Sequence, residues 1–118
     1  MLDPQYLPHL NNNYWFAQLG PEFQRYILEH AHLQHVQKEQ RIFLSGDAFD
    51  GMYAVLEGAV RLGYIDIQGK EAVAAIAEPI MWFGEISLVD QQPRSHDAIA
   101  IQKSTILHLP SASIQQLL

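Results

Sequence analysis

The chain has 118 residues, a length that suits one folded domain rather than two. Its residues are 48% hydrophobic and 17% charged, which is typical of a folded protein and excludes a disordered one. Cysteine is absent, which excludes disulfides, thiolate zinc sites and cysteine nucleophiles. The net charge is −6 and the seven Lys and Arg residues are scattered, so we expect no direct nucleic acid binding by this segment.

The N-terminal region predicts short helices after a polar arm. Residues 1–13 contain two prolines and an Asn triplet and are interpreted as a lead-in arm, with neither a signal peptide nor a membrane span. We therefore expect a cytoplasmic protein with no membrane partner. Residues 14–19 predict a short aromatic helix. Pro21 suits the first position of a second helix that ends near His30, with one apolar face formed by Phe23, Ile27 and Ala31.

The middle of the chain predicts many short strands separated by turns. Period-two patterns or short apolar runs cover residues 33–37, 41–45, 52–56, 59–67, 71–77, 96–101 and 105–109. Gly-containing pairs lie between several of them, and Asp47 and Asp50 are interpreted as turn residues. A last helix is expected from Ser111, whose side chain suits an N-cap. The pattern favours a mainly β fold with flanking helices, a sandwich or barrel-like roll.

Residues 83–98 (FGEISLVDQQPRSHDA) combine groups that suit a ligand with a phosphate beside a ribose. Gly84 allows a tight backbone at the start of a helical turn whose N–H groups, near Ser87, form an anion-binding end. Glu85 can accept a hydrogen bond from a sugar hydroxyl. Arg94 offers a fork-shaped cation and is followed by the hydroxyl of Ser95. The alternative is that Glu85 and Arg94 form an ordinary salt bridge with each other.

This stretch resembles the phosphate-binding cassette of the cyclic-nucleotide-binding family. Its amino-acid sequence is similar to that of bacterial transcription regulators of the catabolite activator and fumarate–nitrate regulator (Crp/Fnr) superfamily. The resemblance implies a double-stranded β-helix, a jelly-roll-like β-roll. The matching positions are Phe83, Gly84, Glu85, Ile86, Ser87, Leu88, Pro93, Arg94 and Ser95.

The resemblance also implies roles for the cassette, with cAMP or cGMP as the regulatory ligand. Glu85 would accept the ribose 2′-hydroxyl, and Arg94 would pair with the cyclic phosphate. Backbone N–H groups near Ser87 and Ser95 would complete the phosphate cradle, while Gly84 would let the backbone approach the ribose. The predicted ligand-binding set is therefore Phe83, Gly84, Glu85, Ile86, Ser87, Arg94 and Ser95.

Three residues depart from the family pattern at the rim of the predicted pocket. Ile80 stands where the family usually has Gly, so this loop must avoid a positive φ or be strained. Gln91 replaces a frequent Gly, and His96 replaces a small residue. A degenerate β-roll, used for dimerisation or for a different ligand, is therefore the alternative function.

As a whole, residues 1–118 are expected to form one sensor domain. Residues 14–31 would be its helical region, residues 33–109 its β-roll and residues 111–118 the start of a C-terminal helix. The effector is expected to be a helix-turn-helix DNA-binding domain that is absent from this chain, and the resemblance implies a homodimer. No catalytic constellation is recognisable, so we expect a regulatory module and not an enzyme. The cluster of His30, His32 and His35 is interpreted as a surface cluster, with no metal bound.

Overall fold

The computed structural model describes residues 5, 7–11, 14–84 and 92–117. Three short helices come first, α1 (Leu7–Leu10), α2 (Tyr14–Ala17) and α3 (Pro21–His30), and a fourth, α4 (Ser111–Leu117), comes last. Between them lie eight strands: β1 (His32–Val36), β2 (Arg41–Phe43), β3 (Gly51–Glu57), β4 (Val60–Ile65), β5 (Glu71–Ala77), β6 (Trp82–Phe83), β7 (Asp97–Ala100) and β8 (Ser104–Pro110). No helix in this described part is long and apolar enough to cross a membrane.

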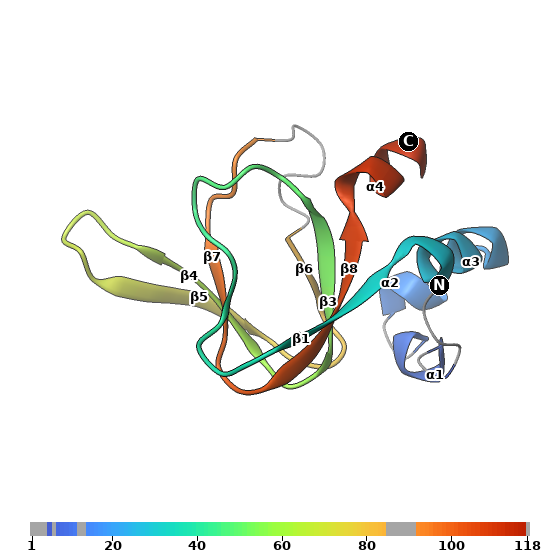
Figure 1. Ribbon diagram of the computed structural model, residues 1–118, viewed down its shortest axis with the longest axis horizontal. Helices are drawn as coiled ribbons and strands as arrows, with labels where there is room; N and C mark the ends of the chain where they lie inside the picture. Colours follow the sequence, from blue (N-terminus) through green and yellow to red (C-terminus); the bar gives the residue numbers. More distant parts are fainter. Residues whose placement is uncertain (1–4, 6, 12–13, 85–91, 118) are drawn as a thin grey trace.

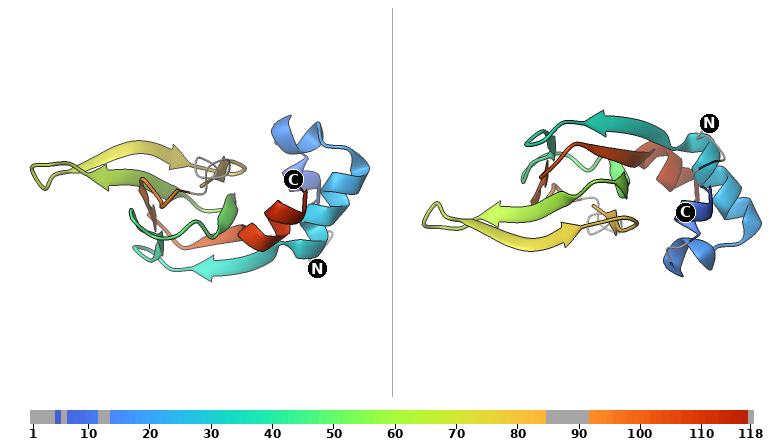
Figure 2. Two further views of the ribbon diagram at one scale, coloured as in Figure 1. Left: turned by 90° about the horizontal axis from the view of Figure 1, so that it is seen from above. Right: turned by 90° about the horizontal axis from the view of Figure 1, so that it is seen from below.

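The strands form two antiparallel four-stranded sheets, with orders β1-β8-β3-β6 and β2-β7-β4-β5. Figure 2 shows these sheets as two layers with the helices gathered at one end, and Figure 1 shows the β4–β5 hairpin extending away from that end. This mainly β architecture with flanking helices confirms the predicted fold class.

The strand β3 is buried on both faces over residues 51–56, which explains the apolar run that precedes the exposed Glu57. On one face Met52 and Leu56 pack with the helices in a core that also contains Ile27 and Ile114. On the other face Val55 and its neighbours pack inside the roll against the second sheet. Because successive strand residues point to opposite faces, a strand between two cores must be apolar at every position.

Several details differ from the sequence-based prediction. The segment interpreted as a polar arm contains α1, and its Leu10 is fully buried, because one apolar residue can anchor a turn too short to show helical periodicity. The expected apolar face of α3 is only partly correct, since Ile27 and Ala31 are buried but Phe23 is 50% exposed. The strand β6 was not predicted, because two residues are too few to show an alternation.

Candidate functional site

Arg94 is fixed in the structure by its backbone as well as by its side chain. Its N–H donates to the carbonyl oxygen of Asp47 at 2.7 Å, and its carbonyl oxygen accepts from the N–H of Gly46 at 2.7 Å. These reciprocal bonds attach the segment before β7 to the loop between β2 and β3. The side chain therefore starts from a defined point and runs inward, where the residue is only 4% exposed.

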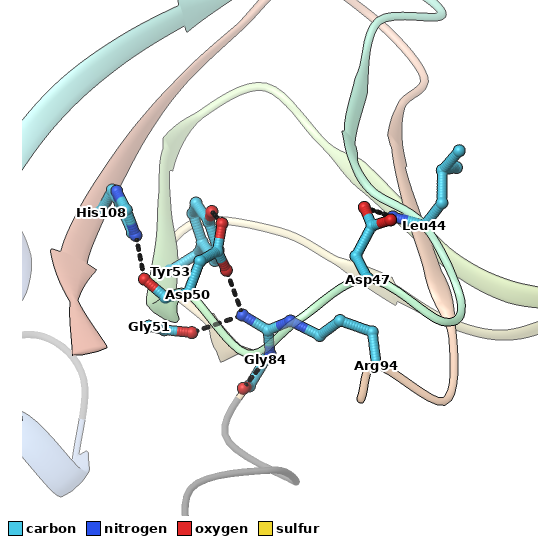
Figure 3. A network of polar contacts seen from close by, with 8 residues as sticks. All are labelled: Leu44, Asp47, Asp50, Gly51, Tyr53, Gly84, Arg94 and His108. Carbon is cyan, nitrogen blue, oxygen red and sulfur yellow. Dashed lines mark hydrogen bonds and ion pairs between the residues drawn. The ribbon is translucent and has the colours of Figure 1, made fainter. Parts of the chain in front are cut away.

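The guanidinium of Arg94 donates three hydrogen bonds within the protein (Figure 3). Nη2 donates to Oδ1 of Asp50 at 2.7 Å and to the carbonyl oxygen of Gly51 at 2.6 Å. Nη1 donates to the carbonyl oxygen of Gly84. The Nε–H is buried and has no hydrogen-bond partner among the described residues. A buried donor without a partner costs about 1–3 kcal/mol, so this atom marks a place where an acceptor would be stabilising.

Aromatic rings surround the same guanidinium. Its carbon lies 4.1 Å from the ring centre of Phe43 and 4.9 Å from that of Phe49. Tyr53 lies further away, at 5.9 Å, and stacks on Phe83. Ring faces attract a cation but accept no N–H hydrogen bond of ordinary strength. They therefore orient the guanidinium plane and leave the Nε donor unsatisfied.

Gly84 lies where the backbone comes closest to Arg94. Its φ is +83°, and a Cβ atom at this position would lie 3.0 Å from Nη1 of Arg94 and 3.4 Å from the ring of Phe43. A side chain here would be strained by the backbone and would press on the guanidinium. The presence of glycine at this position of the predicted cassette is thus explained by the close approach of its backbone to the guanidinium of Arg94.

Asp50 links Arg94 to Tyr53. The Tyr53 hydroxyl donates to Oδ2 of Asp50 at 2.7 Å, while Oδ1 accepts from Arg94. Burial raises the pKa of the Tyr53 phenol above its usual value, and the hydrogen bond to Asp50 raises it further. The phenol therefore remains a proton donor, and the Asp50 carboxylate, whose side chain is 47% exposed, is held from two sides.

A cavity of about 150 Å³ lies beside this network. Its wall is mainly apolar, with one cation and the Ser95–His96 pair, in which Ser95 Oγ lies 2.8 Å from His96 Nδ1. A mainly apolar wall with one buried cation suits a ligand that carries a single oxyanion on an otherwise flat or apolar body. The lining residues are Phe43, Leu62, Ala74, Ala75, Gly84, Arg94, Ser95 and His96.

A larger groove of about 760 Å³ shares Ser95 and His96 with the cavity. It contains two further arginines, Arg41 and Arg61, but Arg61 already pairs with Glu71 at 2.7 Å and Asp97 also lines the groove. Its charges therefore largely balance. The smaller cavity, with a nearly inaccessible guanidinium, is the stronger candidate for an anion site.

The structure brings together part of the predicted ligand-binding set. Gly84, Arg94 and Ser95 line one cavity, and Phe83 is buried next to Gly84. The remaining members of the set, Glu85, Ile86 and Ser87, lie outside the described residues, so their roles stay predictions. Ile80 has no positive φ, and the peptide bond before it is cis.

Sequence reasoning missed the carboxylate that faces Arg94. Asp50 was interpreted as a turn residue, and Glu85 was considered as the partner of Arg94. In the described part of the chain the carboxylate that pairs with Arg94 is that of Asp50. One signal was available: Asp50 directly precedes the fully apolar run of β3, and a buried arginine requires a counter-charge at the edge of a core.

Comparison with known proteins concerns the family and the fold of the chain. A family model described as the cyclic nucleotide-binding domain matches residues 33–118. The chain is 33% identical over 94 residues to the cyclic AMP receptor protein of Thermus thermophilus. This match covers 80% of the chain and 44% of that relative. The chain is 30% identical over 105 residues to the global nitrogen regulator of Synechocystis, covering 87% and 44%. The chain thus spans about half the length of these curated relatives.

Solved structures give the same result for the fold. The catabolite activator protein of Thermus thermophilus has a TM-score of 0.78 at 31% identity, covering 86% of this chain and 48% of that one. The sensor domain of the transcriptional regulator DNR from Pseudomonas aeruginosa has a TM-score of 0.85 at 18% identity, covering 95% and 75%. At that identity the second likeness concerns the fold alone.

Proposed function

This chain belongs to the cyclic nucleotide-binding domain family, and we propose that it is a ligand-sensing module that binds cAMP or cGMP with the cyclic phosphate on Arg94. The relative named as a cyclic AMP receptor protein supports the ligand class. Binding changes no covalent bond in this proposal. The module reports that a ligand is present, and a different part of the protein acts on that information.

The observation that carries the proposal is the unsatisfied Nε–H of a buried arginine at the wall of a cavity. A phosphate oxygen would accept from this donor in a charge-assisted bond, which is stronger than a neutral one. Because Nε has almost no accessible surface in the structure, the guanidinium must shift toward the cavity when the anion binds, and the Phe43 and Phe49 rings limit the orientations it can take. The apolar remainder of the wall suits the flat face of a purine better than a free inorganic ion.

The remaining roles are proposed on the basis of the family resemblance. Glu85 would recognise the ribose 2′-hydroxyl, and N–H groups near Ser87 and Ser95 would support the phosphate. The chain would be the sensor part of a Crp/Fnr-type transcription regulator that acts as a homodimer. DNA would be contacted by a separate domain, since the seven basic residues of this chain are scattered along its sequence and its net charge is −6.

A second candidate is a β-roll that senses another ligand or none. It is favoured by the internal satisfaction of Arg94, whose guanidinium already has Asp50, Gly51 and Gly84 as partners. On this reading the guanidinium is part of the core structure and its charge is neutralised by Asp50. The two candidates differ in whether a nucleotide binds at all, and a titration separates them.

Isothermal titration calorimetry with cAMP and with cGMP tests the proposal. Arg94→Lys keeps the charge but loses the fork and its Nε donor, so we expect affinity to fall by about tenfold to a hundredfold, corresponding to a charge-assisted bond of about 1.5–3 kcal/mol. Arg25→Lys, at an exposed position of α3 that lines neither the cavity nor the groove, is the matched control and should bind as the wild type does. Absence of heat from the wild type at millimolar cAMP and cGMP would refute the proposal.

A further inference from the structure

The hydroxyl of Ser95 and the imidazole of His96 form a hydrogen-bonded pair at the wall of the cavity that contains Arg94. Ser95 Oγ lies 2.8 Å from His96 Nδ1, and both residues line the cavity and the larger groove beside it. We propose that His96 is a positioning residue whose protonation turns the Ser95 hydroxyl from the ring toward a bound oxyanion, so that ligand affinity rises as the pH falls. This inference rests on the proposed function for the identity of the ligand.

The backbone around Ser95 and His96 is anchored at both ends. On one side, the backbone of Arg94 is hydrogen-bonded to the loop between β2 and β3. On the other side, Asp97 pairs with β4 as the first residue of β7, and its Oδ1 accepts from the N–H of Ser45 at 2.7 Å. Ser95 and His96 are the two residues between these anchors. Their side chains therefore start from fixed points beside the guanidinium.

The groups around the imidazole leave histidine as the one residue type there that titrates near neutral pH. The Tyr64 ring on β4 meets the His96 ring edge to face, with ring centres 6.0 Å apart and an interplanar angle of 77°, and this contact restricts rotation of the imidazole. The charged residues that share the groove with His96 are Arg41 on β2, Arg61 on β4, Glu71 on β5 and Asp97 on β7. Arginine and carboxylate side chains ordinarily keep their charge between about pH 5.5 and about pH 8, whereas histidine does not.

The direction of the hydrogen bond between Ser95 and His96 depends on the number of protons on the ring. A neutral imidazole with its proton on Nε2 has an acceptor at Nδ1, so the Ser95 hydroxyl donates to the ring. An imidazolium has an N–H group at both nitrogens, so Nδ1 donates and the Ser95 oxygen accepts. The hydroxyl proton can then point into the cavity. His96 therefore acts through Ser95 and needs no contact of its own with the ligand.

The orientation of the hydroxyl matters because an oxyanion offers only acceptors. When the ring is neutral, an oxyanion beside Arg94 meets the lone pairs of the Ser95 oxygen, unless the bond to His96 breaks first. When the ring is charged, the hydroxyl donates to the oxyanion without losing a bond. The cyclic phosphodiester is a strong acid that keeps its single negative charge throughout, so its own titration does not contribute. Linkage fixes the sign: protonation of His96 strengthens binding, and binding favours protonation by the same factor.

Calorimetric titration of the full chain with cAMP and with cGMP, from about pH 5.5 to about pH 8, tests the proposal. In the wild type we expect the affinity to be about three- to tenfold higher at the lower pH, as for one partly exposed charge-assisted contact. His96→Gln keeps a polar side chain but does not titrate, so its ratio of affinities should be at least about twofold smaller. His108, which is hydrogen-bonded to the carbonyl oxygen of Asp50, titrates equally in both proteins, so the comparison removes its contribution.

Two further variants separate positioning from other effects of a histidine. The matched control is His35→Gln, because His35 is exposed and its Nδ1 also lies near a hydroxyl, at 3.3 Å from Thr105 Oγ1, but lines neither the cavity nor the groove. It should keep the wild-type ratio. Ser95→Ala keeps the imidazole and removes the hydroxyl, so its ratio should fall as in His96→Gln. A wild-type ratio in His96→Gln, or in Ser95→Ala, would overturn the positioning role, the second by showing that the charge of the ring acts on the ligand directly.

Failure of the proposed function leaves a separate result. If the wild type binds neither nucleotide at any pH, the role of His96 is decided in the ligand-free protein by long-range proton–nitrogen correlation spectra, which identify the ring nitrogen that carries the proton. At about pH 8 we expect the proton on Nε2, and we expect the Nδ1 resonance to shift in Ser95→Ala because its donor is lost. A proton on Nδ1 at that pH, or an Nδ1 resonance that Ser95→Ala leaves unchanged, would overturn the control of the hydroxyl by His96.

Discussion

The variant Arg94→Met tests whether the guanidinium of Arg94 serves ligand binding or the stability of the fold. Methionine preserves an unbranched apolar stem beneath the Phe43 and Phe49 rings and removes the charge. The variant loses the donors to the Asp50 carboxylate and to the Gly51 and Gly84 carbonyl oxygens. Asp50 is half exposed and can be hydrated instead, so the loss of its Arg94 partner costs little free energy of folding. The carbonyl oxygen of Gly51, in a buried bond, loses its Arg94 donor at a cost of about 1–3 kcal/mol, and the carbonyl oxygen of Gly84, in a partly buried bond, loses its donor at a smaller cost.

The gains are of the same size. The unsatisfied Nε–H disappears, which recovers about 1–3 kcal/mol, and the dehydration of a buried cation, worth several kcal/mol, is no longer required. We therefore expect the free energy of unfolding of Arg94→Met to lie within about 1 kcal/mol of the wild-type value, or above it.

Urea denaturation of the ligand-free chain, followed by circular dichroism, measures this difference. Arg61→Met is the matched control, because it removes an arginine from a partly exposed pair and should change stability by less than about 1 kcal/mol. A loss of more than about 3 kcal/mol in Arg94→Met would show that the guanidinium is structural. That result would favour the β-roll that binds no nucleotide over the proposed sensor.

Two further predictions concern Tyr53 and Gly51. The pKa of Tyr53 is raised above its ordinary value of 10.0, so its contribution to stability is complete below pH 10 and is lost as the pH rises, by about 1.4 kcal/mol per pH unit. In urea titrations from about pH 9 to about pH 11, the advantage of the wild type over Tyr53→Phe should stay nearly constant up to about pH 10 and then shrink, by about 1.4 kcal/mol in total at pH 11. Tyr64→Phe, at an exposed position, is the control variant. Gly51→Ala places a Cβ atom 2.1 Å from a backbone oxygen at a φ of +128° and should cost more than about 3 kcal/mol. Gly69→Ala, at a φ of +80° with open space around it, should cost only about 1–2 kcal/mol, and equal losses in the two variants would contradict the packing of Gly51 against β8.

The fold was largely predictable because its signals are local. Alternation and turn residues located seven of the eight strands of the described chain, and the apolar run of β3 is explained by its burial on both faces. The strand β6 and the helix α1 were missed because two and four residues carry no periodicity. The exposure of Phe23 depends on where α3 lies relative to the rest of the molecule, which no helical pattern contains.

The site was predictable only in part, for a different reason. Gly84, Arg94 and Ser95 belong to one stretch of sequence, so a motif could bring them together. Asp50 reaches Arg94 from 44 positions away, and the sequence holds 13 acidic residues, any of which could neutralise an arginine. Selecting the correct one requires the register of β3 against β8, which long-range packing sets and no short motif records.

The size of the cavity limits how the proposed site could recognise the base of a nucleotide. A cavity of about 150 Å³ is smaller than the roughly 300–1,000 Å³ that small-molecule sites usually occupy. A ligand with its phosphate at Nε of Arg94 can therefore place only part of its body there and must extend past the cavity wall. Ser95 and His96 form the part of that wall shared with the larger groove, so a purine passing on this side would meet the hydroxyl and the imidazole in succession. Base preference would then depend on these two side chains, while affinity would depend on Arg94.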